Sequence, residues 1–225
     1  MLRADQIINP FTGQVIDKYE STWWYLIRGA KKFNRTPTEM EVLLENEPLV
    51  FTQTPKLAKI KDIDFTRLNL IRAGVILYTI VDDEVLLGLG LDKTYQELTD
   101  FSGGISKNET RTPVIAALRE LCEETLGLYC HIQINDIQNN LALYDRHHLV
   151  IFYKVDNDID TISQQFMDMK KQYKNKIEID EIVWLTPDQL FDAMIHHQYA
   201  YVYIRLANLL IKAGDFYDDL YYLST

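Results

Sequence analysis

The 225-residue sequence contains only two cysteines, Cys122 and Cys130. Two cysteines provide no disulfide framework, and their spacing is not the C-x-x-C spacing of a structural zinc site. We therefore expect both thiols to be unpaired, with Cys122 as a core residue, as is typical of proteins in a reducing compartment. The cysteine content favours an intracellular, cytoplasmic protein.

Long hydrophobic runs are also missing. No apolar run reaches the length of a membrane span, and the first residues lack the apolar stretch of a signal peptide. The sequence has neither the G-x-x-x-x-G-K-[ST] motif of P-loop proteins nor the G-x-S-x-G motif of serine hydrolases. With 47% hydrophobic and 25% charged residues, the composition is that of an ordinary globular domain.

Basic residues are too few to balance the acidic ones, and the formal net charge is −10. This balance argues against an extended nucleic-acid track, which needs clustered lysine and arginine. An RNA substrate held by a local patch stays open as an alternative. The densest basic groups are Arg28, Lys31, Lys32 and Arg35, and Lys170, Lys171, Lys174 and Lys176.

Residues 1–70 differ in pattern from the rest of the chain. Apolar residues recur at helical spacing over 23–33, and Thr36-Pro37 is typical of the start of a second helix. We therefore expect a mainly helical N-terminal extension over residues 1–70, packed on a main domain over residues 71–225.

Strands and helices alternate after residue 70, which indicates an α/β fold with a mixed sheet between helical layers. The expected strands cover 71–81, 84–91, 98–101, 141–144, 148–155 and 181–185. The expected helices cover 113–125, 159–174, 187–196 and 199–213.

Three glutamates, Glu120, Glu123 and Glu124, lie within five residues of the helix expected over 113–125. Residues at i, i+3 and i+4 share one face of a helix, so these carboxylates should be neighbours that repel each other. A bound divalent cation would explain their proximity, because Mg²⁺ takes oxygen ligands and bridges carboxylates to substrate phosphates.

The segment from Gly103 to Gly127, GGISKNETRTPVIAALRELCEETLG, resembles the signature of the Nudix hydrolases, G-x5-E-x7-R-E-U-x-E-E-x-G-U, where U is a bulky apolar residue. The R-E-U-x-E-E core is matched by Arg119 to Glu124, and G-x5-E by Gly103 to Glu109. Nine residues instead of seven separate Glu109 from Arg119, and Leu126 adds one position before Gly127. The loop beside the site should therefore be longer than usual.

The resemblance implies a Nudix-like α/β/α sandwich and a set of residue roles. Glu123 and Glu124 would be metal ligands, and Glu120 would be the base or a further ligand, oriented by Arg119. Gly104 would offer its carbonyl to Mg²⁺ or Mn²⁺. Members often add an acidic residue just before a tryptophan-bearing strand, and Glu178, with Glu181 as the alternative, precedes Trp184.

The activity implied is metal-dependent hydrolysis of a diphosphate bond in a nucleoside diphosphate linked to another group. The long N-terminal region is similar to that of Nudix proteins of large DNA viruses, which raises removal of the mRNA cap, in a host cytoplasm, as an alternative. The acidic balance favours a small nucleotide instead. A catalytically silent Nudix-fold module that binds a nucleotide or a protein is the remaining alternative.

Overall fold

The computed structural model describes residues 6–8, 15–17, 55–156, 158–173, 177–196 and 201–222. The chain divides into two compact units, Met1–Thr52 and Gln53–Thr225. In the first, strands β1 (Gln6–Ile8) and β2 (Val15–Asp17) pair antiparallel. The helices predicted over 23–33 and from Pro37 lie outside the described residues.

The second unit starts earlier than the predicted boundary at residue 71. Strand β3 (Lys56–Lys59) pairs antiparallel with β8 (Leu141–Tyr144), so it belongs to the main sheet. Two short 3-10 helices follow, η2 (Ile60–Asp62) and η3 (Phe65–Arg67). Residues 53–70 are therefore part of the main unit and not of a helical extension.

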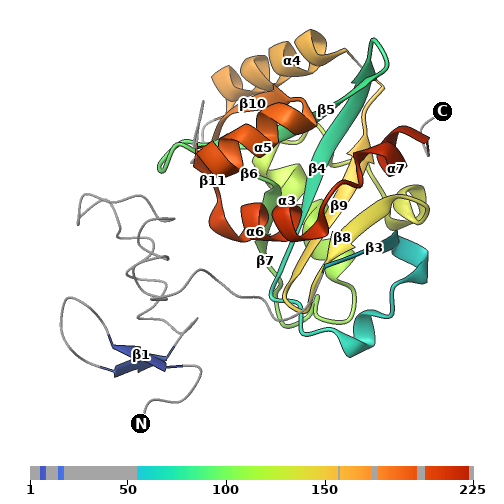
Figure 1. Cartoon of the computed structure of the whole chain (residues 1–225). Coiled ribbons are helices and arrows are strands. Elements are labelled where there is room, and N and C mark those ends of the chain that lie inside the picture. The colour runs from blue at the N-terminus through green and yellow to red at the C-terminus, as the bar shows by residue number, and fades with distance from the viewer. Residues whose placement is uncertain are drawn as a thin grey trace. The chain divides into compact units, whose positions relative to one another are not determined.

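Nine strands among the described residues form one mixed sheet in this unit (Figure 1). Strands β4 (Arg72–Val81) and β5 (Glu84–Asp92) form the predicted hairpin around Asp82-Asp83. Strand β4 also pairs in parallel with β9 (His148–Lys154), and its first residues pair with β7 (Phe101–Gly104). The remaining strands are β6 (Glu97–Thr99), β10 (Ile179–Leu185) and β11 (Tyr201–Val202).

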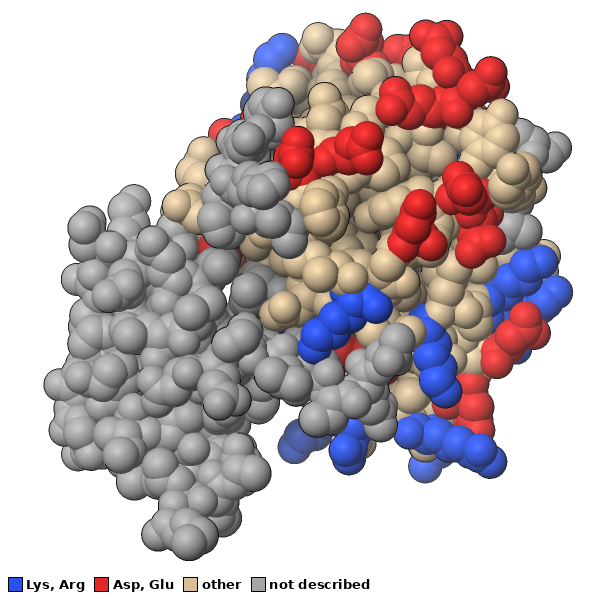
Figure 2. Space-filling model, in the orientation of Figure 1, with Lys and Arg blue, Asp and Glu red and all other residues tan. Residues whose placement is uncertain are grey.

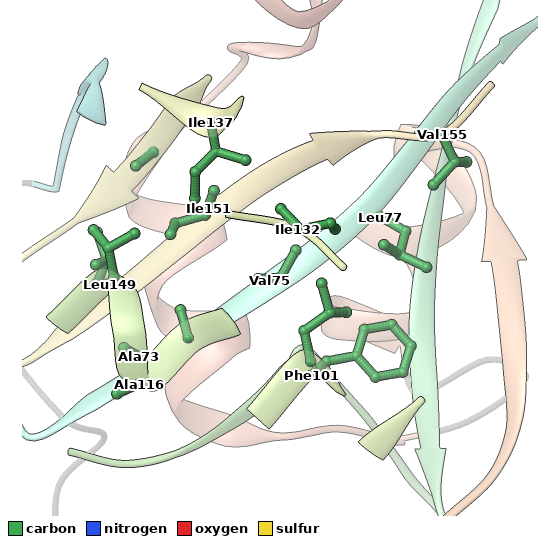
Figure 3. Close-up of a cluster of buried hydrophobic side chains, with 14 of the residues drawn as sticks. Ala73, Val75, Leu77, Phe101, Ala116, Ile132, Ile137, Leu149, Ile151 and Val155 are labelled. Carbon is green, nitrogen blue, oxygen red and sulfur yellow. The ribbon is translucent and has the colours of Figure 1, made fainter. Parts of the chain in front are cut away.

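Helices cover both faces of the sheet, which confirms the predicted α/β/α sandwich. Helices α3 (Pro113–Glu124) and α4 (Ile159–Gln172) pack on one face through buried residues such as Leu121 and Phe166. Figure 3 shows part of this core, with Val75 and Phe101 facing the same cluster. On the other face lie α5 (Pro187–His196), α6 (Ile204–Ala213) and α7 (Tyr217–Tyr222).

The helix predicted over 199–213 begins later than expected, because Tyr201–Val202 forms strand β11 beside β6 before α6 starts. Helix α7 lies in the acidic, aromatic tail, where no element was predicted. None of the helices in the described ranges has the length and apolar content needed to cross a membrane.

Charge is unevenly distributed on the face shown in Figure 2. Most acidic side chains on this face lie over its upper and middle parts, and most lysine and arginine side chains lie towards the lower edge, with a smaller basic group at the upper left. On this face the described basic residues form no continuous track.

Candidate functional site

Helix α3 carries the predicted glutamates beside its buried stripe. It begins with Thr112 as the N-cap residue and Pro113 in the first turn, as the sequence predicts. Val114, Ala117 and Leu121 are buried against the sheet. Glu120 and Glu124 project from the edge of α3 towards β7, which ends at Gly103-Gly104.

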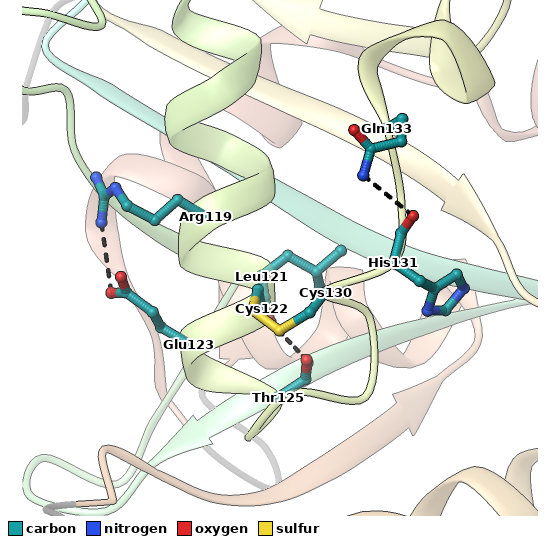
Figure 4. Close-up of a disulfide and its surroundings, with 8 residues drawn as sticks. All are labelled: Arg119, Leu121, Cys122, Glu123, Thr125, Cys130, His131 and Gln133. Atoms are coloured by element: carbon teal, nitrogen blue, oxygen red, sulfur yellow. Dashed lines mark hydrogen bonds and ion pairs between the residues drawn. A yellow bond between two sulfur atoms is a disulfide. The ribbon is translucent and has the colours of Figure 1, made fainter.

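Arg119 is the centre of the hydrogen bonds at this edge. Its guanidinium donates to Glu109 Oε1 at 2.9 Å, Glu120 Oε1 at 2.6 Å and Glu123 Oε2 at 3.4 Å. It also donates to the carbonyl of Gly104 at 3.2 Å. Figure 4 shows Arg119 and Glu123 facing each other across one turn of α3. One cation therefore holds together oxygens from the loop, the helix and the end of β7.

Glu109 is the carboxylate most firmly held by Arg119, although the resemblance assigned it no role. It is buried and also accepts hydrogen bonds from the main-chain N–H and the hydroxyl of Ser106. These bonds, with that from Arg119 the strongest, lower the pKa of Glu109 to about 2. Glu109 fixes the lengthened loop before α3 and the direction of the Arg119 side chain.

Replacing Glu109 with glutamine is expected to lower the free energy of unfolding by about 2 kcal/mol at pH 7, because a charged hydrogen-bond network is lost. The folded-state pKa of Glu109 lies below its ordinary value, so its contribution is present above pH 4.5 and is lost as the pH falls towards 2. Urea unfolding at a series of pH values should show the difference between wild type and variant shrinking over that range. A difference independent of pH would contradict this account.

Glu120 lies between α3 and β7. A Cβ atom at Gly103 would come within 2.1 Å of Glu120 Oε1, whereas one at Gly104 would meet nothing within 4 Å. Burial raises the pKa of the Glu120 carboxyl, and the bonds from Arg119 oppose this increase. Gly103 is thus the glycine that makes room for a predicted catalytic residue.

Glu124 is oriented differently from its two neighbours. Its Oε2 accepts the main-chain N–H of Ser102 in β7 at 2.8 Å. Burial raises the pKa of the Glu124 carboxyl well above its usual range, and Arg72 acts in the opposite direction. Glu123, by contrast, has a side chain that is 59% exposed.

Glu178 lies at the start of β10, where its carbonyl accepts the N–H of Lys93 next to the end of β5. Across the described ranges, no three Asp, Glu, His or Cys side chains come close enough to hold a metal ion. The structure brings Glu120, Glu123 and the Gly104 carbonyl together around Arg119. The oxygen donors are those that a hard cation takes, so the residues fit Mg²⁺ or Mn²⁺ by their chemistry.

Sequence reasoning missed a second polar cluster under the site. Arg72, Asp100 and His148 meet beside Ser102, and Asp100 and His148 are buried. An aspartate between the two short strands β6 and β7 and an arginine at the start of β4 are the sequence signals that could have indicated it.

The two cysteines form a disulfide, so the prediction of unpaired thiols is wrong. After α3 the chain turns back through Leu126 and Gly127, whose φ values are 57° and 96°, and the two cysteine Cα atoms lie 4.5 Å apart (Figure 4). The separation of eight residues between the cysteines did not indicate that the chain turns back between them. Because the cysteines are paired, they no longer support the expectation that the protein lies in a reducing compartment.

Opening this disulfide is expected to lower the free energy of unfolding by about 2 kcal/mol, because it closes a short loop in the unfolded chain. Urea unfolding with and without a dithiol reductant measures the effect. A variant carrying both Cys122→Ser and Cys130→Ser should be equally stable in both conditions, and a reductant effect on that variant would contradict the assignment to this bond.

No protein-family model matches this sequence, and no curated protein matches it either. Among solved structures, the chain is similar to a binary complex of the Ap4A hydrolase of C. elegans, with a TM-score of 0.40 and 15% identity over 67% of this chain and 99% of that chain. It is also similar to NrtR of Shewanella oneidensis, with a TM-score of 0.37 and 12% identity over 64% of this chain and 62% of that one. At such identities, no activity is transferred from these proteins to this chain.

Proposed function

We propose that this chain is a Nudix-type hydrolase that depends on Mg²⁺ or Mn²⁺ and cleaves a diphosphate bond in a nucleoside diphosphate linked to another group. The observation that carries the proposal is the set of oxygens from Glu120, Glu123 and Gly104 gathered around one cation, the Arg119 guanidinium. Carboxylates at this spacing repel each other unless a positive charge lies among them.

Each residue of the cluster has a role in this proposal. Glu120, Glu123 and Glu124, with the carbonyl of Gly104, would hold the divalent cation, and Glu178 would supply a further oxygen. The cation would neutralise charge on the phosphate oxygens. Glu120, which is partly buried and bonded to Arg119, would position or deprotonate the attacking water if it is not a ligand. Arg119 would keep Glu120 in place through its own anchor on Glu109.

Binding the cation requires a local rearrangement, because Arg119 holds the same oxygens. We expect Arg119 to keep its bonds to Glu109 and to release Glu123, the most weakly bound and most exposed of its three carboxylate partners. The 3.4 Å separation of Arg119 and Glu123 makes this exchange inexpensive, since exposed pairs contribute about 0–1 kcal/mol.

A catalytically silent binding module is the second candidate, and one observation favours it. Arg119 already neutralises the acidic cluster, and across the described ranges no group of three acidic, histidine or cysteine side chains is ready to hold a metal. In such a module, Arg119 would be a permanent structural cation.

A product-resolved hydrolysis panel separates these candidates. It would present a dinucleoside polyphosphate, a nucleoside diphosphate sugar, an NAD-like dinucleotide and capped RNA, each with Mg²⁺, Mn²⁺ or EDTA. Divalent-dependent release of a nucleotide from any of them supports the hydrolase, and cleavage of capped RNA above the small nucleotides assigns the decapping alternative. Absence of turnover on every substrate would favour the binding module.

A further inference from the structure

A polar cluster lies on the face of the sheet opposite to α3. Ala73 and Val75 of β4 pack towards α3, and because side chains alternate along a strand, Arg72 and Gly74 face the other way. The Arg72 guanidinium accordingly lies 5.0 Å from the centre of the Tyr203 ring, at the N-cap of α6. The Arg72 side chain therefore leaves β4 on the face of the sheet opposite to α3.

Ser102 of β7 connects the two faces. On one side, its hydroxyl oxygen accepts Arg72 Nε–H at 3.0 Å, and its carbonyl accepts the terminal nitrogen of Arg72 at 2.9 Å. Its main-chain N–H donates to Glu124 Oε2 at 2.8 Å. Arg72 thus donates two hydrogen bonds to Ser102, and the main-chain N–H of Ser102 in turn orients the Glu124 carboxylate.

Further hydrogen bonds restrain the segment of β7 around Ser102. The Ser102 hydroxyl donates to the carbonyl of Asp100 at 3.1 Å, and Asp100 Oδ2 lies 3.1 Å from Nε2 of His148, the first residue of β9. A Cβ atom at Gly74 would come within 2.4 Å of Asp100 Oδ2 and 2.1 Å of Ser102 Cβ, so only glycine leaves room for both residues. These hydrogen bonds restrain this segment of β7, while His148 Nδ1 is buried without a hydrogen-bond partner among the described residues.

We propose that Arg72 is a positioning residue for Glu124, acting through Ser102 from the opposite face of the sheet. The proposal rests on the proposed function, in which Glu124 binds the divalent cation. With Oε2 held by Ser102, the other carboxylate oxygen has a defined place for a ligand bond. Partners that orient metal ligands from behind typically change metal affinity or activity 10- to 100-fold when they are removed.

Charge alone predicts the opposite effect. Arg72 is a cation close to Glu124, so its removal would tighten binding of a divalent cation if it acted only by repulsion. Loss of positioning would weaken binding even when the charge is kept. Lysine keeps the charge but lacks the planar fork that bonds Ser102 twice.

The test is Mn²⁺ binding by the full-length protein, followed by electron paramagnetic resonance, together with kcat and KM on the best substrate of the hydrolysis panel. For Arg72→Lys we expect about tenfold weaker Mn²⁺ binding and a lower kcat with little change in KM. Arg72→Met should also weaken Mn²⁺ binding. Ser102→Ala, which removes only one of the two bonds, should have a smaller effect of the same sign. Combining it with Arg72→Lys should add less than the sum of the separate changes.

Exposed Arg67 supplies the matched control, since Arg67→Lys should leave Mn²⁺ affinity and kcat unchanged. Unchanged or tighter Mn²⁺ binding in folded Arg72→Lys, or strictly additive effects with Ser102→Ala, would overturn the positioning role. If Arg72→Lys does not fold, an unchanged affinity in Ser102→Ala would overturn it. Failure of the proposed function is distinct, because wild-type protein would then neither bind Mn²⁺ nor hydrolyse any substrate.

Discussion

Replacing Glu124 with glutamine is expected to lower kcat roughly a thousandfold, because a charged oxygen that would hold the divalent cation becomes a neutral amide. Steady-state hydrolysis of the best panel substrate at saturating Mg²⁺ measures this loss. Mn²⁺ binding, followed by electron paramagnetic resonance, should weaken in parallel. An effect on kcat without an effect on Mn²⁺ affinity would assign Glu124 to the water and not to the cation.

The fold should survive this substitution. The glutamine side-chain oxygen can still accept the Ser102 N–H that Glu124 accepts in the structure. Burial raises the pKa of the Glu124 carboxyl, so its ionised form lowers stability as the pH rises above 4.5. The amide has no such cost, and the variant should be at least as stable as wild type at pH 8.

Glu84→Gln is the control, because Glu84 is an exposed glutamate in the β4–β5 hairpin. It should leave turnover unchanged. Near-normal turnover in Glu124→Gln would remove Glu124 from the proposed ligands and would favour the binding module.

Local signals explain why α3 and the β4–β5 hairpin could be predicted. Thr112-Pro113 defines the start of the helix through its own backbone preferences, and the apolar stripe follows the helical period. Asp82-Asp83 similarly indicates a turn between two apolar strands. In each case the residues that determine the element are its own residues or their neighbours.

The parts that could not be predicted depend on contacts between distant residues. Arg72 and His148 become neighbours only through the parallel register of β4 and β9, which nothing in the sequence specifies. Strand β3 has four residues, which are too few to show an alternating pattern of apolar residues. It forms a strand because it pairs with the edge of β8. The cysteines are brought together by a left-handed turn at Leu126. Leucine rarely adopts a positive φ, so the sequence did not predict this turn.

The roles of the two glycines show the same limit at the site itself. The resemblance assigns a function to the carbonyl of Gly104, but the structure identifies Gly103 as the position where a side chain would force the Glu120 carboxylate to move. Arg119 and Glu120 are adjacent and joined by a 2.6 Å hydrogen bond, so a side chain at residue 103 that displaces Glu120 would also disturb Arg119.

Gly103→Ala is expected to lower kcat/KM about 100-fold, because the new methyl group would lie 2.1 Å from Glu120 Oε1 and must displace that carboxylate. Gly104→Ala is the matched variant at the next residue. Its methyl group meets nothing within 4 Å, and it keeps the main-chain carbonyl that the proposal assigns to the cation, so kcat/KM should change less than about threefold. Hydrolysis of the same substrate by both variants, with thermal unfolding of each, separates catalytic from folding effects. If the two alanines reduce kcat/KM equally, the loss comes from the backbone of this segment. If only Gly104→Ala is impaired, Glu120 is not the residue that needs the space, and the catalytic role proposed for it fails.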